Sequence, residues 1–258
     1  MPDYDNPPIQ EAVCEFTFVP AEDNPEWDLT IPGKLQVEQE LAEYSAPSRQ
    51  QHVQTIAATN AKGQPDFAIS NILFRVHLPR KDGKALLSVG HNTLGVNVLH
   101  PYEGWKNFRP RIISALKVYV RVANQSTVQR IGLRYINRII APVVGASKAS
   151  KFLTSMQTEI KATTEAKANI EGRLTAINAR HEFETADGIK IFVTHATINP
   201  TTPNTSEYLL DIDVVYDQQP IDGVDKIEPV IDELHDIEGG IFEALITEDA
   251  RKLFNARS

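Results

Sequence analysis

The stretch VQRIGLRYINRIIAP at residues 128–142 decides how the chain can fold. Successive side chains of a β-strand point to opposite faces of the sheet. One face would then carry Ile131, Leu133, Tyr135 and Ile139, and the other would carry Arg130, Arg134 and Arg138. The pattern predicts a strand with one core-like face and one cationic face. Asn137 is the exception, because its parity places an amide on the apolar face, where it would need hydrogen-bond partners.

The composition is that of a folded globular chain. Its 258 residues, 41% of them hydrophobic, suffice for one large domain or two small ones. The formal net charge of -8 opposes broad binding to nucleic acids or anionic membranes, because the summed field repels phosphate. No apolar run approaches the roughly 20 residues of a membrane helix, and the start MPDYDNPPIQ lacks a signal-peptide pattern. We therefore expect a cytoplasmic protein without membrane contacts.

Apolar periodicity predicts strands followed by long helices. Alternating runs indicate strands at residues 9–19, 51–58, 69–78, 85–90 and 94–99. Helical spacing indicates helices at 34–44, 102–123, 147–170 and 224–245, and Thr247 is suited to cap a last short helix.

A hairpin is expected near the middle of the second half. Its strands at 173–185 and 189–199 would be joined by a three-residue loop in which Gly188 can take a positive φ. This register pairs Phe183 with Ile191 and Glu184 with Lys190. A further strand at 207–217 alternates apolar residues with Asp211, Asp213 and Asp217.

These elements predict an α+β fold in which long helices pack on one antiparallel sheet or on two. A meander followed by a helix occurs at 51–123 and again at 173–245, which indicates two pseudo-repeated halves without sequence identity between them. We expect residues 1–258 to form a single compact unit. Its sub-halves would be 1–146 and 171–258, joined by the helical segment 147–170.

The arginine row and the aspartate row are the candidate ligand-binding residues: Arg130, Arg134, Arg138, Asp211 and Asp213. If the two strands are neighbours, these side chains form a salt-bridge ladder or the wall of a polar groove. Guanidinium groups suit both phosphate and carboxylate. The alternatives are a solvated outer sheet face, a ligand groove and a protein interface.

Other reactive side chains give weaker indications. His181 and His195 fall on one face of the hairpin as diagonal neighbours, but no third metal ligand accompanies them. His235 and Asp236 are adjacent on a helix, which favours a packing pair over a catalytic dyad. The single cysteine, Cys14, allows no internal disulfide and is more typical of a small buried hydrophobe than of a reactive thiol. We expect no metal and no cofactor.

Four segments resemble a sporadically distributed family of uncharacterised prokaryotic proteins. They are NPPIQEAVCEF at 6–16, PYEGW at 101–105, IGLRYINRI at 131–139 and ELHDIEGGIFEALIT at 233–247. The resemblance spans nearly the whole chain, and LRYINRI is its most specific part. It implies a bacterial, archaeal or phage source and an accessory role such as defence, toxin immunity or mobile-element biology. It supplies no catalytic residue.

Phosphate-binding glycine loops, nucleophile elbows and HExxH motifs are absent from the sequence. The leading hypothesis is therefore a non-enzymatic binding protein that recognises another protein or an anionic small ligand. The enzyme alternative is a phosphate- or nucleotide-handling protein in which arginines hold phosphate while Asp211 and Asp213 hold Mg²⁺. A third hypothesis is that the charged faces are only solvated and that the protein acts through homo-oligomer contacts at Trp105 or at the helix 148–170.

Overall fold

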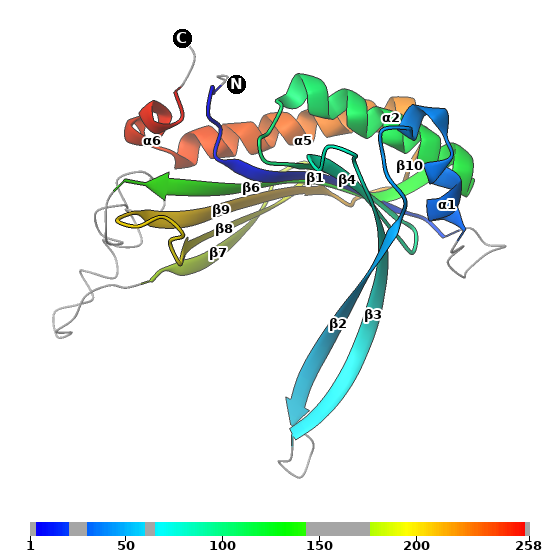
Figure 1. Ribbon diagram of the computed structural model, residues 1–258, viewed down its shortest axis with the longest axis horizontal. Coiled ribbons are helices and arrows are strands. Elements are labelled where there is room, and N and C mark those ends of the chain that lie inside the picture. Colours follow the sequence, from blue (N-terminus) through cyan, green and yellow to red (C-terminus); the bar gives the residue numbers. More distant parts are fainter. Residues whose placement is uncertain (1–3, 21–29, 60–64, 143–175, 256–258) are drawn as a thin grey trace.

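The computed structural model describes residues 4–20, 30–59, 65–142 and 176–255. One antiparallel sheet carries two long helices on one of its faces (Figure 1). The predicted α+β class is confirmed. The strands are β1 (Ile9–Phe18), β2 (Ser48–Thr59), β3 (Pro65–Pro79), β4 (Ala85–Gly90), β5 (Thr93–Leu99), β6 (Thr127–Ala141), β7 (Asn178–Glu184), β8 (Lys190–Ile198), β9 (Ser206–Tyr216) and β10 (Ile221–Asp222). The helices are α1 (Ile31–Gln36), the 3₁₀ helix η1 (Gln39–Leu41), α2 (Trp105–Ala123), α5 (Val224–Leu245) and α6 (Glu248–Leu253).

The two halves of the chain meet in the middle of this sheet. The strand order is β2-β3-β4-β5-β1-β6-β9-β8-β7, with β10 added beside β6. The first strand of the chain, β1, lies between β5 and β6, and β6 pairs along its length with β9. The meanders are therefore parts of one sheet, a point that the sequence left open. That the halves are pseudo-repeats stays a prediction.

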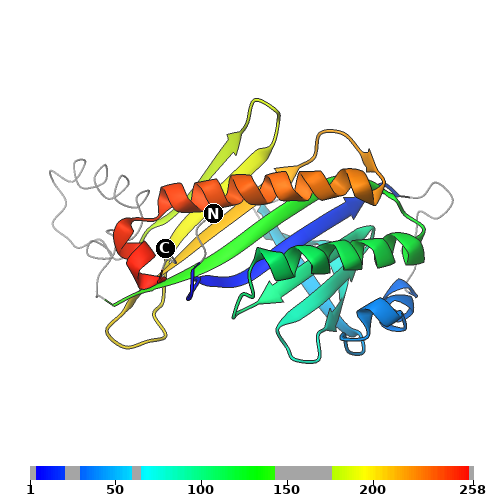
Figure 2. The ribbon, with the colours of Figure 1, turned by 90° about the horizontal axis from the view of Figure 1, so that it is seen from above.

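Strand β6 has the two-faced pattern expected of it. Ile131, Leu133 and Ile139 are fully buried under the helices, while Arg134 is exposed on the other face. The helices α2 and α5 lie side by side across the apolar face (Figure 2). Arg109 of α2 links them by donating from Nε and Nη2 to the carboxylate of Asp232 in α5, at 2.6 and 2.8 Å.

Both long helices start at a glycine whose φ is positive. Gly104 (φ 86°) precedes α2 and Gly223 (φ 93°) precedes α5, a backbone region that side chains with a Cβ rarely enter. Helix α2 therefore begins at Trp105, three residues after the start predicted from spacing. Helix α5 has the predicted bounds, and Thr247 caps α6 by accepting from the amide of Ala250.

The hairpin β7–β8 has the predicted register. Phe183 pairs with Ile191 and Glu184 with Lys190. Gly188 has a φ of 78° in the connecting turn. In contrast, the single helix predicted at 34–44 is wrong, because Glu38 takes an extended conformation that separates α1 from η1. The helix predicted at 147–170 lies outside the described residues.

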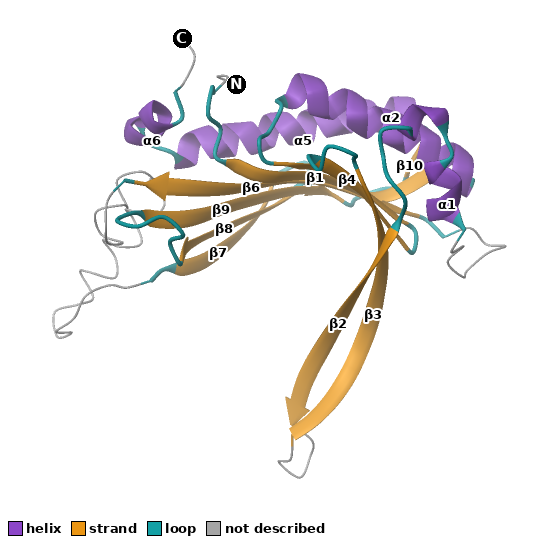
Figure 3. Ribbon diagram, viewed as in Figure 1, coloured by secondary structure: helices purple, strands orange, loops and turns teal. Residues whose placement is uncertain are grey.

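The hairpin β2–β3 extends away from the helical layer on the opposite side of the sheet (Figure 3). The end of β3 joins β4, and among the strands of the described ranges the rest of β2 and β3 pair only with each other. None of the helices in the described ranges is both long enough and apolar enough to span a membrane.

Candidate functional site

The predicted ligand-binding residues do lie together, on the sheet face opposite the helices. We call Arg130, Arg134, Arg138, Asp211 and Asp213 the charged sheet face. It exists because β6 and β9 are direct neighbours, with Arg134 opposite Asp213 in the register. Sequence alone could not establish this adjacency, since 64 residues separate the end of β6 from the start of β9.

Arginines on this face are already paired with carboxylates. Arg134 donates from Nε to Asp211 Oδ1 at 2.7 Å and from Nη2 to Oδ2, so both carboxylate oxygens are engaged. This bidentate bond raises the pKa of Arg134 above its ordinary value. Arg130 lies 3.7 Å from Glu15 and 4.0 Å from Asp213. Burial raises the pKa of Asp213, and the two arginines oppose that rise.

Arg138 forms the most buried of these pairs. It donates to Glu207, whose side chain is 0% exposed, from Nε at 2.8 Å and also from Nη2. The same carboxylate accepts from the amides of Thr201 and Thr202, at 2.7 and 3.2 Å. Burial raises the pKa of Glu207, but these hydrogen bonds outweigh it, so the pKa is lowered. The geometry is that of a salt-bridge ladder.

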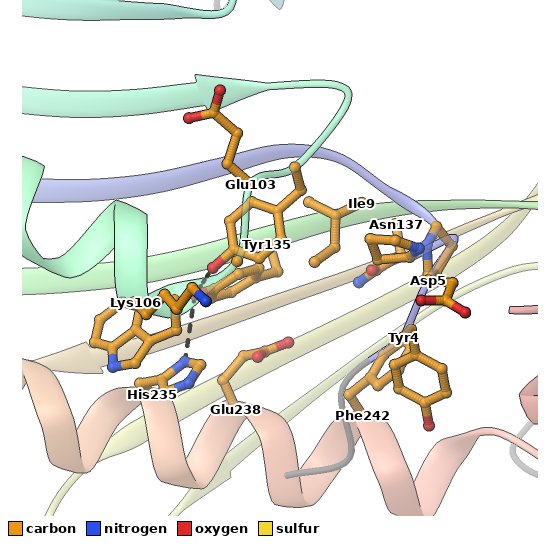
Figure 4. A pocket seen from close by; sticks show the side chains of 15 residues that line it. Tyr4, Asp5, Ile9, Glu103, Lys106, Tyr135, Asn137, His235, Glu238 and Phe242 are labelled. Carbon is orange, nitrogen blue, oxygen red and sulfur yellow. Dashed lines mark hydrogen bonds between the residues drawn. The ribbon is translucent and has the colours of Figure 1, made fainter. Parts of the chain in front are cut away.

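A second candidate site lies on the helical side of the sheet, where a cavity of about 580 Å³ opens. We call it the helix-side cavity. Four parts of the chain line it: the N-terminal segment, the residues around the start of α2, strand β6 and helix α5 (Figure 4). Its walls include Tyr4, Asp5, Ile9, Tyr102, Glu103, Trp105, Lys106, Tyr135, Asn137, His235, Glu238 and Phe242.

The N-terminal segment is fixed as one wall of this cavity. Tyr4 packs edge-on against Phe242 and Phe254, and its hydroxyl donates to Glu243 at 2.5 Å. The amide of Asn6 bonds to the carbonyl of Phe254 at 3.1 Å. Residues from Tyr4 to Ile9 therefore close a space between β6 and α5.

Hydrogen-bonded rings form the opposite wall. The hydroxyls of Tyr102 and Tyr135 lie 3.2 Å apart, and Tyr135 Oη is 3.3 Å from His235 Nδ1 (Figure 4). His235 also stacks on Trp105, with ring centroids 3.9 Å apart. Burial lowers the pKa of His235 to about 4, so the imidazole is neutral at pH 7. His235 is thus a packing residue, as its position suggested, and Trp105 belongs to this wall.

Glu238 is the unusual member of the lining. It is only 4% exposed, and no hydrogen bond or ion pair joins its carboxyl group to any residue in the described ranges. Burial alone raises its pKa to about 8. Its side chain rises from α5 toward Tyr135 and Asn137 on the strand (Figure 4).

Asn137 supplies a second unpaired polar atom. The residue is 1% exposed, and its Nδ2 donates to the carbonyl of Leu210 at 3.2 Å. Its Oδ1 is buried and accepts no hydrogen bond from the described residues. The expectation that Asn137 would be buried is confirmed, and within the described ranges its amide oxygen lacks the partner that its amide nitrogen has.

The predicted histidine pair is also formed, with the rings of His181 and His195 5.3 Å apart. Within the described ranges, no group of three or more histidine, cysteine, aspartate or glutamate residues has metal-binding geometry. Cys14 is fully buried in β1, and burial raises the pKa of its thiol, as expected for a packing residue.

Sequence reasoning missed Glu238 although a signal was present. Ile227, Ile231, Leu234, Phe242 and Leu245 form the apolar stripe of α5. Glu238 falls on that stripe at helical spacing, four residues after Leu234 and four before Phe242. An acidic residue at such a position indicates either a buried pair or a binding group. The segment around Tyr4 gave no comparable signal in the sequence, because it reaches α5 only through the tertiary fold.

Comparison with known proteins assigns neither a family nor a function to this chain. No family model matches the sequence, no curated protein matches it, and no solved structure matches its fold.

Proposed function

We propose that the protein is a non-enzymatic binding protein whose ligand occupies the helix-side cavity. The observation that carries this proposal is that two buried polar groups, the carboxyl group of Glu238 and Asn137 Oδ1, line the same cavity without a hydrogen-bond partner among the described residues. A buried polar group without a partner costs about 1–3 kcal/mol, and a buried charge costs more. A ligand that bonds to both groups would remove this cost.

The dimensions and chemistry of the cavity agree with such a role. Small-molecule sites typically enclose about 300–1,000 Å³ and combine aromatic walls with a few converging polar groups. Here about 580 Å³ is enclosed by rings that include Tyr102, Trp105 and Phe242. The accessory roles implied by the family resemblance are compatible with a binding protein, and they stay predictions.

A thermal-shift screen against cationic, neutral and anionic metabolites, including nucleotides, tests this proposal. A ligand that binds only the folded protein raises its melting temperature by mass action. We expect the shift to vanish in Glu238→Phe, which places a ring in the cavity. It should persist in Glu233→Gln, an exposed position on the same helix. A shift that survives Glu238→Phe, or silence across all three classes, would contradict the proposal.

Recognition through the charged sheet face is a second candidate for binding another protein or an anionic ligand. The observation in its favour is Arg134, which is 46% exposed and held in place by Asp211. Any anionic ligand must compete with the carboxylates that these arginines already bind. Loss of partner capture in Arg134→Gln, with capture retained in Glu238→Phe, would favour this face over the cavity.

The enzyme alternative requires Asp211 and Asp213 to bind Mg²⁺. Both oxygens of Asp211 accept from Arg134, so metal binding would have to displace a bidentate pair. This alternative predicts metal-dependent turnover that is lost in Asp211→Asn.

A further inference from the structure

Resting on the proposed function, we infer that the ligand of the helix-side cavity is a small organic ammonium ion, bound by Glu238 and Asn137 between aromatic rings. The inference concerns the chemical class of the ligand. It follows from three properties of the lining: its free hydrogen-bonding groups, its charges and its rings.

Two polar groups of the cavity lining have no hydrogen-bond partner among the described residues. They are Asn137 Oδ1 and the carboxyl group of Glu238, which accepts with both oxygens once it is ionised. Some neighbouring donors already have partners, because Asn137 Nδ2 bonds to Leu210 and the hydroxyls of Tyr102 and Tyr135 bond to each other and to His235. A ligand that brings N–H donors complements the carboxylate of Glu238 and Asn137 Oδ1.

The charges select a cation among such ligands. Asp5, Glu103 and Glu238 are the acidic residues of the lining, and Lys106 is its basic residue. Glu103 is neutralised by Arg80 and Arg111, each 3.3 Å away. Lys106 is exposed and forms no ion pair with Glu238. Among the described residues no cation pairs with Glu238, so its ionised form attracts a cationic ligand and repels an anionic one.

The rings favour the same ligand class. Tyr4, Tyr102, Trp105, Tyr135 and Phe242 all line the cavity. The face of an aromatic ring attracts a cation, by about 0.5–1 kcal/mol in exposed sites and about 2 kcal/mol where water is excluded. An ammonium group thus gains from the walls as well as from the carboxylate.

Binding should release a proton. In the empty cavity burial holds a proton on Glu238 at neutral pH, since the pKa of this residue is raised to about 8. An ammonium ion favours the carboxylate form, so the proton leaves as the ligand enters. The other titratable groups facing the cavity are Tyr4, Asp5, Tyr102, Glu103, Lys106, Tyr135 and His235. Of these, His235 is already neutral above about pH 4.

The test uses phenethylamine as the probe, with N-acetylphenethylamine as its neutral match and phenylacetate as its anionic match. Trp105 lies in the cavity wall, so its fluorescence in a Trp27→Phe background reports binding directly. We expect the affinity for phenethylamine to rise about tenfold per pH unit between pH 6 and 8 and to level off above pH 8. The neutral match should bind at least about 100-fold more weakly.

The variants distinguish failure of the ammonium inference from failure of the proposed binding function. Glu238→Gln should lose the pH dependence and most of the affinity, while Glu233→Gln should behave as the parent. If N-acetylphenethylamine or phenylacetate binds more tightly than the amine, and Glu238→Phe abolishes that binding, the cavity is a ligand site but the cation inference is wrong. If none of the three probes binds, the ammonium inference is overturned, and the wider metabolite screen alone decides the proposed function.

Discussion

At the scale of single residues, Glu238 and His235 oppose each other in how stability depends on pH. Burial raises the pKa of Glu238 from an ordinary 4.5 to about 8 and lowers that of His235 from 6.5 to about 4. Between about pH 4.5 and 8 the folded protein holds a proton on Glu238 that the unfolded chain releases, so this residue lowers stability as pH rises. His235 acts in the opposite sense, because between about pH 4 and 6.5 the unfolded chain holds the proton and stability falls as pH drops.

Replacing Glu238 by Gln should isolate the first effect. The difference in unfolding free energy between variant and parent should shift in favour of the variant by up to about 4 kcal/mol between pH 5 and pH 9, because only the parent must bury a charge at high pH. Urea unfolding across this range measures the difference. A constant difference would show that Glu238 is not buried as described. Glu233→Gln is the matched control on an exposed position.

At the scale of elements, the ion pairs of the sheet differ in how much each is expected to contribute to stability. The pair of Arg138 and Glu207 is largely buried, whereas Arg180 and Glu182 on β7 form a pair with both side chains more than half exposed. Exposed pairs contribute little because water screens them. A buried carboxylate that accepts several hydrogen bonds leaves several donors unpaired when it is removed.

We therefore expect Glu207→Gln to lower the free energy of unfolding by about 2–3 kcal/mol at pH 7. The same substitution at Glu182 should change it by less than about 0.5 kcal/mol. Chemical denaturation of both variants provides the comparison. Equal effects at the two positions would contradict the view that burial decides the strength of these pairs.

Two glycines test how the backbone conformation at a position decides the effect of alanine on stability. Gly188 has a φ of 78° in the β7–β8 turn, while Gly240 lies in α5 with open space around its Cβ position. Alanine at 188 should destabilise by about 1–2 kcal/mol, because L-residues resist the left-handed region. Alanine at 240 should stabilise by up to about 1 kcal/mol through helix propensity. Opposite signs in thermal unfolding are the expected result, and a shared sign would refute it.

At the scale of the whole molecule, stability should fall from the centre of the sheet to the edge at β7. Strands β1 and β6 are paired on both sides and covered by the helices. Most side chains of β7 are exposed, and within the described part of the chain its one partner strand is β8. In hydrogen exchange, the bonded amides of β1 and β6 should exchange only through global unfolding, and those of β7 through local opening at least about 100 times faster. Uniform protection across the sheet would contradict this gradient.

Prediction from sequence succeeded wherever a local pattern was decisive. The period of two placed the arginines of β6 on one face, and turn chemistry with charge pairing gave the register of β7–β8. The helix predicted at 34–44 failed because its apolar spacing was satisfied equally by two short pieces separated at Glu38. Local periodicity does not distinguish between these arrangements.

The sequence by itself determined the strands, the long helices, the two-faced character of β6 and the absence of the common catalytic motifs. All of these can be read from patterns among residues that are close in the chain. Only the tertiary structure decided that Arg134 meets Asp211 and that Tyr4, Tyr135 and Glu238 enclose one cavity. These groups are 77 to 234 positions apart in the sequence. Arg134 meets Asp211 because β6 pairs with β9, and the cavity forms because β1 and α5 both lie against β6. These are non-local choices that burial of the whole sheet imposes.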